Sequence, residues 1–181
     1  MTFAQSVRSA LSNYATFSGR SRRSEYWWFY LFTILVSLAT SAVDAVLSTA
    51  FDNPFEIVGT ITSLALLLPT LALTARRLHD TGRTGWWMLL PVVPLLATVV
   101  VAFAAVFAAV FSSDAGGAAV GGVTMLLLAC ALVTLATFII LLVFLCQDSE
   151  PGPNRYGPSP KQQPMPPGGY VPPTGYVPPT G

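Results

Sequence analysis

Charged residues are scarce in this chain. Asp, Glu, Lys and Arg make up 9% of its 181 residues, against roughly a quarter in a soluble domain. Apolar residues make up 53%, and they gather into long runs instead of alternating with polar ones. Because so few charges cannot cover a core for water, the sequence predicts a polytopic membrane protein. The formal net charge of +1 leaves no electrostatic footprint for a nucleic-acid partner.

Cysteine and histidine are also rare, and their scarcity excludes two kinds of site. Cys130 and Cys146 lie in one apolar run, separated by about 24 Å of helix, which is too far for a disulfide. Together with the single histidine, His79, they cannot assemble a structural zinc set. We therefore expect reduced cysteines, no metal and no cofactor.

Lys and Arg are missing from two of the three connections between apolar runs. All nine basic residues lie before the first run, between the second and third, or after the fourth. The connections near residues 48–56 and 112–122 carry only acids. Because basic residues near span ends stay in the cytoplasm, both termini and the loop 76–85 are predicted to be cytoplasmic. The fold class we infer is an all-α membrane protein with four transmembrane helices, N-in/C-in.

The apolar runs set the positions of the spans. About 20 apolar residues match a hydrocarbon core of about 30 Å, and the predicted spans are residues 26–47, 57–75, 86–111 and 123–146. Pro91 and Pro94 predict a bend near the start of the third span. In the same span Ala104 and Ala108 form a small-xxx-small pair suited to close helix contact, which leaves a homo-oligomer open. Asp44 lies near the far end of the first span, where we expect its carboxylate to reach water.

The first 25 residues form a cytoplasmic N-terminal segment. Phe3, Val7 and Ala10 recur at helical spacing, and Thr2 with Gln5 has the form of a capping box. The pattern predicts a short helix lying in the plane of the membrane interface, with polar residues on its wet side. A disordered leader is the alternative.

Proline dominates the chain after the last span. Residues 151–181 hold eleven of the fifteen prolines, and Gly-Tyr-Val-Pro-Pro-Thr occurs twice in succession. Such a composition cannot bury a core, so residues 147–181 are predicted to be a disordered cytoplasmic tail with polyproline II character. The tail is either a plain spacer or a docking peptide for a protein partner.

Aromatic residues begin the first and third spans, directly after basic clusters. Amphipathic rings at such positions sit at headgroup depth. The predicted interface anchors are Tyr26, Trp27, Trp28, Trp86 and Trp87.

Three polar blocks of the sequence carry a resemblance to a known family. These blocks are Phe17-Ser18-Gly19-Arg20 with Arg23 and Glu25-Tyr26-Trp27; Arg76-Arg77-Leu78-His79-Asp80-Thr81-Gly82-Arg83 with Gly85-Trp86-Trp87; and Gly152-Pro153-Asn154-Arg155-Tyr156-Gly157-Pro158 with Pro160. Through them the chain resembles the bacterial membrane family of domain of unknown function 805 over about residues 3–160. Thr84 departs from the serine that the family often has there. The resemblance implies a small multi-pass protein of the bacterial plasma (inner) membrane, with no established activity.

All three blocks fall on the predicted cytoplasmic side, where four interpretations stay open. The arginines could be simple positive-inside anchors, with Glu25 and Asp80 neutralising some of them. They could instead bind an anionic headgroup or a phosphorylated ligand, because a guanidinium matches phosphate oxygens and His79 adds a titratable group. The residues proposed for such a site are Arg20, Arg22, Arg23, Arg76, Arg77, His79, Asp80 and Arg83.

The other two interpretations are a transporter or channel component and a lipid-acting enzyme. Ion pathways usually need ionisable groups inside the bilayer, and spans two to four offer hydroxyls instead. An enzyme would use His79 as a base beside Asp80, Asp148 or Glu150, but no nucleophile motif accompanies them. We favour a non-enzymatic scaffold or adaptor with a basic site for anionic membrane lipids or partners.

Overall fold

Helices form nearly all the regular structure of the chain in a computed structural model, which describes residues 1–51, 56–111 and 117–161. No strand occurs in these ranges. Four helical stretches of the described chain are long and apolar enough to cross a membrane, Arg23–Phe51, Ile57–Asp80, Gly85–Ala108 and Gly121–Cys146. The predicted all-α fold with four spans is therefore confirmed. In chain order the elements are α1 (Phe3–Ser12), α2 (Arg23–Phe51), α3 (Ile57–Asp80), the 3-10 helix η1 (Gly85–Leu89), α4 (Val92–Phe111) and α5 (Gly117–Cys146).

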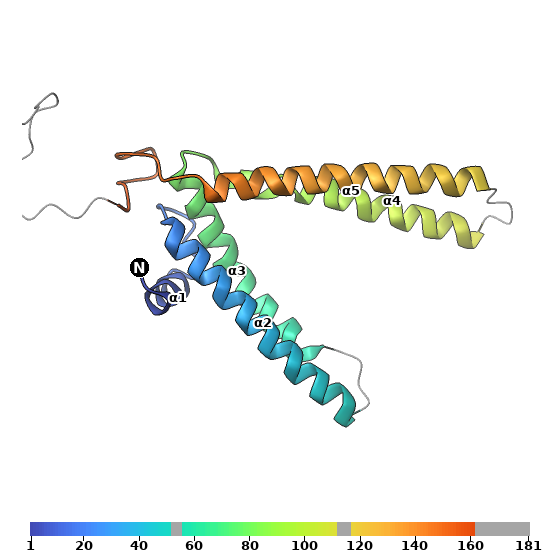
Figure 1. Cartoon of the computed structure of the whole chain (residues 1–181), viewed down its shortest axis with the longest axis horizontal. Helices are drawn as coiled ribbons and strands as arrows, with labels where there is room; N and C mark the ends of the chain where they lie inside the picture. The colour runs from blue at the N-terminus through green and yellow to red at the C-terminus, as the bar shows by residue number, and fades with distance from the viewer. Residues whose placement is uncertain (52–55, 112–116, 162–181) are drawn as a thin grey trace, which may run out of the picture.

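The long helices form two antiparallel pairs that meet at one end (Figure 1). One pair is α2 with α3 and the other is α4 with α5, and the pairs diverge away from their meeting point. We call that meeting point the junction. It also holds α1, the turn at residues 81–84 and the segment 147–161. The far ends of the pairs lead into residues 52–55 and 112–116, which lie outside the described residues.

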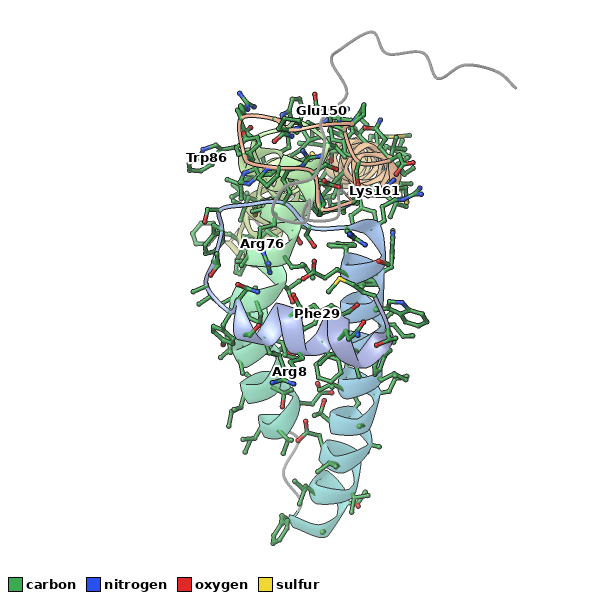
Figure 2. All side chains as sticks on the ribbon, turned by 90° about the vertical axis from the view of Figure 1, so that its left-hand side faces the viewer. Arg8, Phe29, Arg76, Trp86, Glu150 and Lys161 are labelled. Carbon is green, nitrogen blue, oxygen red and sulfur yellow. The ribbon has the colours of Figure 1, made fainter. Side chains whose placement is uncertain are left out.

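Helix α1 begins with the predicted capping box. The Thr2 hydroxyl accepts the Gln5 backbone N–H at 3.4 Å, and the Gln5 side chain accepts the Thr2 N–H at 2.9 Å. The helix lies across α2 and α3 (Figure 2), with Ser6 and Ala10 buried and Arg8 exposed. The helix is confirmed, and its placement in a membrane interface stays a prediction.

Helix α3 continues past residue 75, where the sequence predicted its end. The expected loop 76–85 thus begins as the last turn of α3, which ends at Asp80. Arg77 and Asp80 of this turn are buried and paired with each other, so the turn lies inside the protein and not in a solvated loop. The predicted interruption near Pro91 is present. The third span begins as η1, and a turn at Leu90 and Pro91 separates η1 from α4. Proline has no N–H to continue a helix and fixes its own φ.

Residues 147–161 correct the prediction of a disordered tail beginning at residue 147. They fold back over the junction, and an isolated bridge joins Asn154 to Gly157. Composition misled the prediction because this segment is held through its carbonyl groups, which any residue type supplies. The repeats of the tail fall in residues 162–181, outside the described part of the chain.

Buried side chains gather at the junction and not along the spans. The apolar core there consists of Ala10, Tyr26, Phe29, Leu73, Leu78, Leu141 and Leu145. In the most apolar stretch of α3 only 17% of residues are buried, and in that of η1 and α4 none are. Spans that expose apolar side chains over most of their length are suited to lipid surroundings.

Asp44 has a different role from the one expected. The residue is buried, at 4% exposed, and its carboxylate accepts the backbone N–H groups of Val58 at 3.0 Å and Gly59 at 2.7 Å instead of reaching water. Glu56, the N-cap residue of α3, makes no capping bond with its side chain. A carboxylate is favourable here because it satisfies orphan N–H groups and faces the positive end of the helix dipole.

Candidate functional site

The centre of the junction is the carboxylate of Asp80, at the end of α3. Arg20 Nε lies 2.9 Å from Oδ1, and Arg77 Nη1 lies 2.6 Å from Oδ2. All three side chains are at most 1% exposed. Because a buried charge is costly unless paired and hydrogen-bonded, this carboxylate is what allows two guanidinium groups to be buried side by side.

The remaining donors of the two arginines bind backbone carbonyls in the last turn of α5 and in the segment that follows it. Arg20 Nη1 donates to the Gly152 carbonyl and Nη2 to the Glu150 carbonyl, both at 2.7 Å. Arg77 Nε donates to the Leu145 carbonyl at 3.1 Å, and its Nη2 donates to the Gln147 carbonyl. We call Arg20, Arg77, Asp80 and these four carbonyls the Asp80 network. It fastens the C-terminal segment to the end of α3.

A second buried polar cluster joins α1, α2 and α3. Glu25 accepts hydrogen bonds from the hydroxyls of Ser9 at 2.7 Å and Ser21 at 2.6 Å. Arg76 Nη1 lies 4.0 Å from the Glu25 carboxylate. Its Nε and Nη2 are buried and have no hydrogen-bond partner among the described residues. Glu25 and Asp80 therefore neutralise neighbouring arginines, as the anchor interpretation expected.

His79 is held on one face of its ring and at one ring nitrogen. Its ring stacks on Tyr156, with centroids 3.8 Å apart and an interplanar angle of 5°. Its Nδ1 lies 3.3 Å from the Gly19 carbonyl oxygen. Asn154 donates to the His79 carbonyl at 3.0 Å and to the Glu150 carboxylate at 2.9 Å. The C-terminal segment thus fixes the only histidine of the chain.

The other predicted basic residues lie around the edge of the junction. Arg22 Nε donates to the Pro160 carbonyl. Arg23 is half-exposed, with Nη2 3.6 Å from Asp148. Arg83 Nη1 donates to the Gln147 side chain at 2.6 Å, and its guanidinium lies 3.9 Å from the centroid of the Phe144 ring.

Every residue selected from the sequence for an anion site therefore lies at the junction. Arg20, Arg77 and Asp80 share one closed network with protein partners, whereas Arg22, Arg23 and Arg83 keep some access to solvent. A bound anion at these residues stays a prediction. Within the described residues, no three His, Cys, Asp or Glu side chains gather closely enough to hold a metal ion.

The predicted interface anchors divide into two groups. Trp86 is 78% exposed, and Trp28 and Trp87 are 40% and 42% exposed, as lipid-facing rings would be. Tyr26 is instead 9% exposed and belongs to the apolar core, and Trp27 is partly buried against that core. The helical period decides this, since Tyr26 and Phe29 share the face of α2 that packs inward.

The sequence did not predict that residues 145–157 supply the partners of Arg20, Arg77 and His79. Asn154 and Tyr156 were part of the third block of resemblance, and that block was the only signal for them. Gln147 and the carbonyl groups left no signal, because a backbone acceptor occurs at every position.

Four apolar helices joined by a buried charge network define an integral membrane protein with a polar junction at one end of its spans. The chain belongs to the family described as "Protein of unknown function (DUF805)", which matches residues 14–158.

Two relatives in Escherichia coli (strain K12) are named as inner membrane proteins. The chain is 31% identical to "Inner membrane protein YhaH" over 154 residues, which are 85% of this chain and 94% of the relative. It is 33% identical to "Inner membrane protein YhaI" over 153 residues, 84% of this chain and 92% of the relative. No solved structure matches the chain. The protein is thus an integral inner-membrane protein of unknown function, as the resemblance implied.

Proposed function

We propose that this protein is a non-enzymatic membrane scaffold with its junction in the cytoplasm. Both termini then face the cytoplasm, and the junction presents a fixed basic surface to anionic headgroups and to protein partners of the tail. The Asp80 network carries this proposal. In this network Arg20 and Arg77 hold backbone carbonyls in place. Residues fixed in this way suit a rigid platform better than a reaction site.

Charge supports the orientation. Every Lys and Arg lies in segments that the fold brings to the junction end of the helix pairs. Basic residues next to spans remain on the cytoplasmic side. The four that keep most access to solvent are Arg8, Arg23, Arg155 and Lys161, and we call them the basic face. Near an anionic leaflet each contributes about 1 kcal/mol of attraction.

Transport is less well supported by the described spans. Within the described residues Asp44 is the one carboxylate deep in the far half of a pair, and both its oxygens accept backbone N–H groups. A carboxylate used in this way caps a helix and offers no free site for an ion. The hydroxyl-lined gap of about 220 Å³ between α2 and α3, formed by residues such as Ser37 and Thr62, has no ionisable group in its lining.

A labelling experiment tests the orientation. Cys130 and Cys146 are first replaced by Ala, and one cysteine is then introduced at either end of the first helix pair. Ser18→Cys marks the junction end and Glu56→Cys the far end, and both positions are exposed. In intact spheroplasts, an impermeant maleimide should label the Glu56→Cys protein only. Labelling of the Ser18→Cys protein before permeabilisation would reject the proposed orientation.

The basic face is tested with the full chain in native mass spectrometry. Replacing its four residues by Gln removes exposed charge and leaves the buried networks intact. We expect several-fold less phosphatidylglycerol to remain bound, because the electrostatic contributions add near the surface. Replacing the exposed acids Asp148 and Glu150 by their amides is the matched control and should not lower retention. Equal retention by the wild type and the four-residue variant would contradict the basic face.

A further inference from the structure

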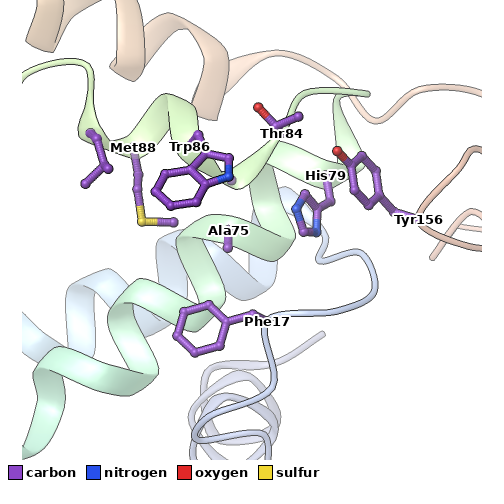
Figure 3. Close-up of a pocket in the computed structure, with 9 residues that line it drawn as sticks. Phe17, Ala75, His79, Thr84, Trp86, Met88 and Tyr156 are labelled. Carbon is purple, nitrogen blue, oxygen red and sulfur yellow. The ribbon is translucent and has the colours of Figure 1, made fainter.

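A cavity of about 520 Å³ opens at the junction between α3 and η1. Its size falls within the 300–1,000 Å³ typical of small-molecule pockets. Figure 3 shows that parts of the chain far apart in sequence form its walls. They are the loop before α2, the last turns of α3, the segment 84–89 and the C-terminal segment. No residue of the Asp80 network or of the basic face lines it.

The cavity has one apolar and one polar end. Phe17, Ala75 and Met88 supply apolar walls, whereas His79 and Tyr156 lie together at the opposite end from Met88 (Figure 3). Trp86 stands between the two ends, and it is the most exposed large apolar side chain among the described residues, at 78%. A tryptophan exposed beside basic helix ends is typical of headgroup depth. A ligand here would therefore meet lipid chains on one side and water on the other.

The hydrogen bonding of His79 determines what the polar end can bind. The Gly19 carbonyl near Nδ1 can only accept, so in the neutral ring Nδ1 carries the proton and Nε2 is an acceptor. Nε2 lies next to Gly85, which also lines the cavity. A Cβ added at Gly85 would lie 3.5 Å from Nε2. Within the described residues no donor reaches Nε2. A ligand that hydrogen-bonds to Nε2 therefore has to supply the donor.

The geometry points to a membrane phospholipid whose headgroup donates a hydrogen bond to His79 Nε2 while one acyl chain lies along Phe17 and Met88. The donor is the ammonium of phosphatidylethanolamine or a hydroxyl of phosphatidylglycerol. This inference goes beyond the scaffold, whose basic face selects lipids by charge alone.

The test compares three lipids with identical acyl chains in native mass spectrometry of the full chain. Phosphatidylethanolamine and phosphatidylglycerol carry a donor, and phosphatidylcholine carries none. We expect the wild type to retain at least one donor lipid about threefold to tenfold more than phosphatidylcholine, the range that one hydrogen bond gives. Equal retention of all three lipids would overturn the inference without any variant.

Two variants separate the hydrogen bond from the cavity wall. His79→Phe keeps a flat ring against Tyr156 but removes Nε2, and it should abolish the preference for donor lipids while phosphatidylcholine retention stays the same. Trp86→Ala removes a wall and should lower retention of all three lipids. Trp28→Ala is the control, since Trp28 is also an exposed ring at a helix start but does not line the cavity. An unchanged preference in the His79→Phe protein would overturn the inference.

The same lipids distinguish this inference from the basic face. A preference for phosphatidylglycerol alone, lost with the four-residue Gln variant and kept in His79→Phe, would show attraction by charge and reject the cavity. A preference for phosphatidylethanolamine that only His79→Phe removes would support the cavity whatever the result for the basic face.

Discussion

The carboxylate of Asp80 and the guanidinium of Arg77, three residues apart on the last turn of α3, lie 2.6 Å from each other with both side chains wholly buried. Arg20 reaches the other oxygen of the same carboxylate at 2.9 Å. One acid thus compensates two bases, and each base uses its other donors on backbone far along the chain. Removing Asp80 would therefore leave two buried guanidinium groups without a negative partner.

Asp80→Asn should be the most destabilising conservative change at the junction. It keeps the shape of the side chain but leaves Arg20 and Arg77 without a negative partner, and breaking a buried pair costs about 3 to 5 kcal/mol. The measurement is the thermal unfolding midpoint of the purified protein in detergent. Asp148→Asn is the control, because Asp148 pairs with Lys161 at the exposed surface and exposed pairs contribute little. Similar midpoints for the two variants would contradict the role given to the Asp80 network.

Arg77→Lys should release the C-terminal segment without unfolding the spans. Lysine keeps the charge but cannot reproduce the planar fork that binds Asp80, Leu145 and Gln147 together. Hydrogen exchange followed by mass spectrometry should show faster exchange in residues 147–157, including the Glu150 amide that donates to the Asp80 carbonyl.

Arg23→Lys provides the comparison for that experiment. Arg23 is half-exposed and meets the same segment only at its edge, so its replacement should leave exchange of residues 147–157 near that of the wild type. If the segment exchanges equally in the wild type and Arg77→Lys, Arg77 does not hold it.

Asp44→Ala should destabilise the first helix pair from its far end. The change leaves the N–H groups of Val58 and Gly59 without their acceptor, and loss of such a cap costs about 0.5 to 2 kcal/mol. Glu56→Ala is the matched control, because that side chain makes no capping bond to α3. Thermal unfolding should separate the two, and a larger loss for Glu56→Ala would show that Asp44 is not the cap.

Gly82→Ala should weaken the turn between α3 and η1. Gly82 has φ of +73°, a left-handed conformation that costs other residues roughly 1 to 2 kcal/mol. The added Cβ would also lie 2.9 Å from Glu150 Oε2, although that carboxylate can move aside. Gly82→Asn should cost less, since Asn tolerates this region of φ.

Gly122→Ala in α5 is the reference for that series. Nothing lies within 4 Å of the Cβ it would gain, and alanine is favoured over glycine inside a helix by about 1 kcal/mol. The unfolding midpoint should stay the same or rise. If the Gly82→Ala protein were as stable as the wild type, the positive φ at residue 82 would not require glycine.

Patterns local in sequence predicted much of the molecule. The four spans follow from run length, the α1 cap from Thr2 and Gln5, and the interruption before α4 from Pro91. Each of these features depends on residues within a few positions of one another. The residues that form the feature are therefore the same ones that predict it. The end of α3 was misplaced because Arg76 and Arg77 look like loop residues until their partners are known.

The sequence by itself therefore determined that this is a four-helix membrane protein with its basic residues gathered at one end, because lipid admits few charges and only fully bonded backbone. Tertiary structure alone decided which guanidinium groups are buried. Arg20 binds a carbonyl 130 residues further along the chain, and Arg77 binds one 68 residues away. Every residue carries a carbonyl, so such a partner has no signature in the sequence and is chosen only when the chain folds.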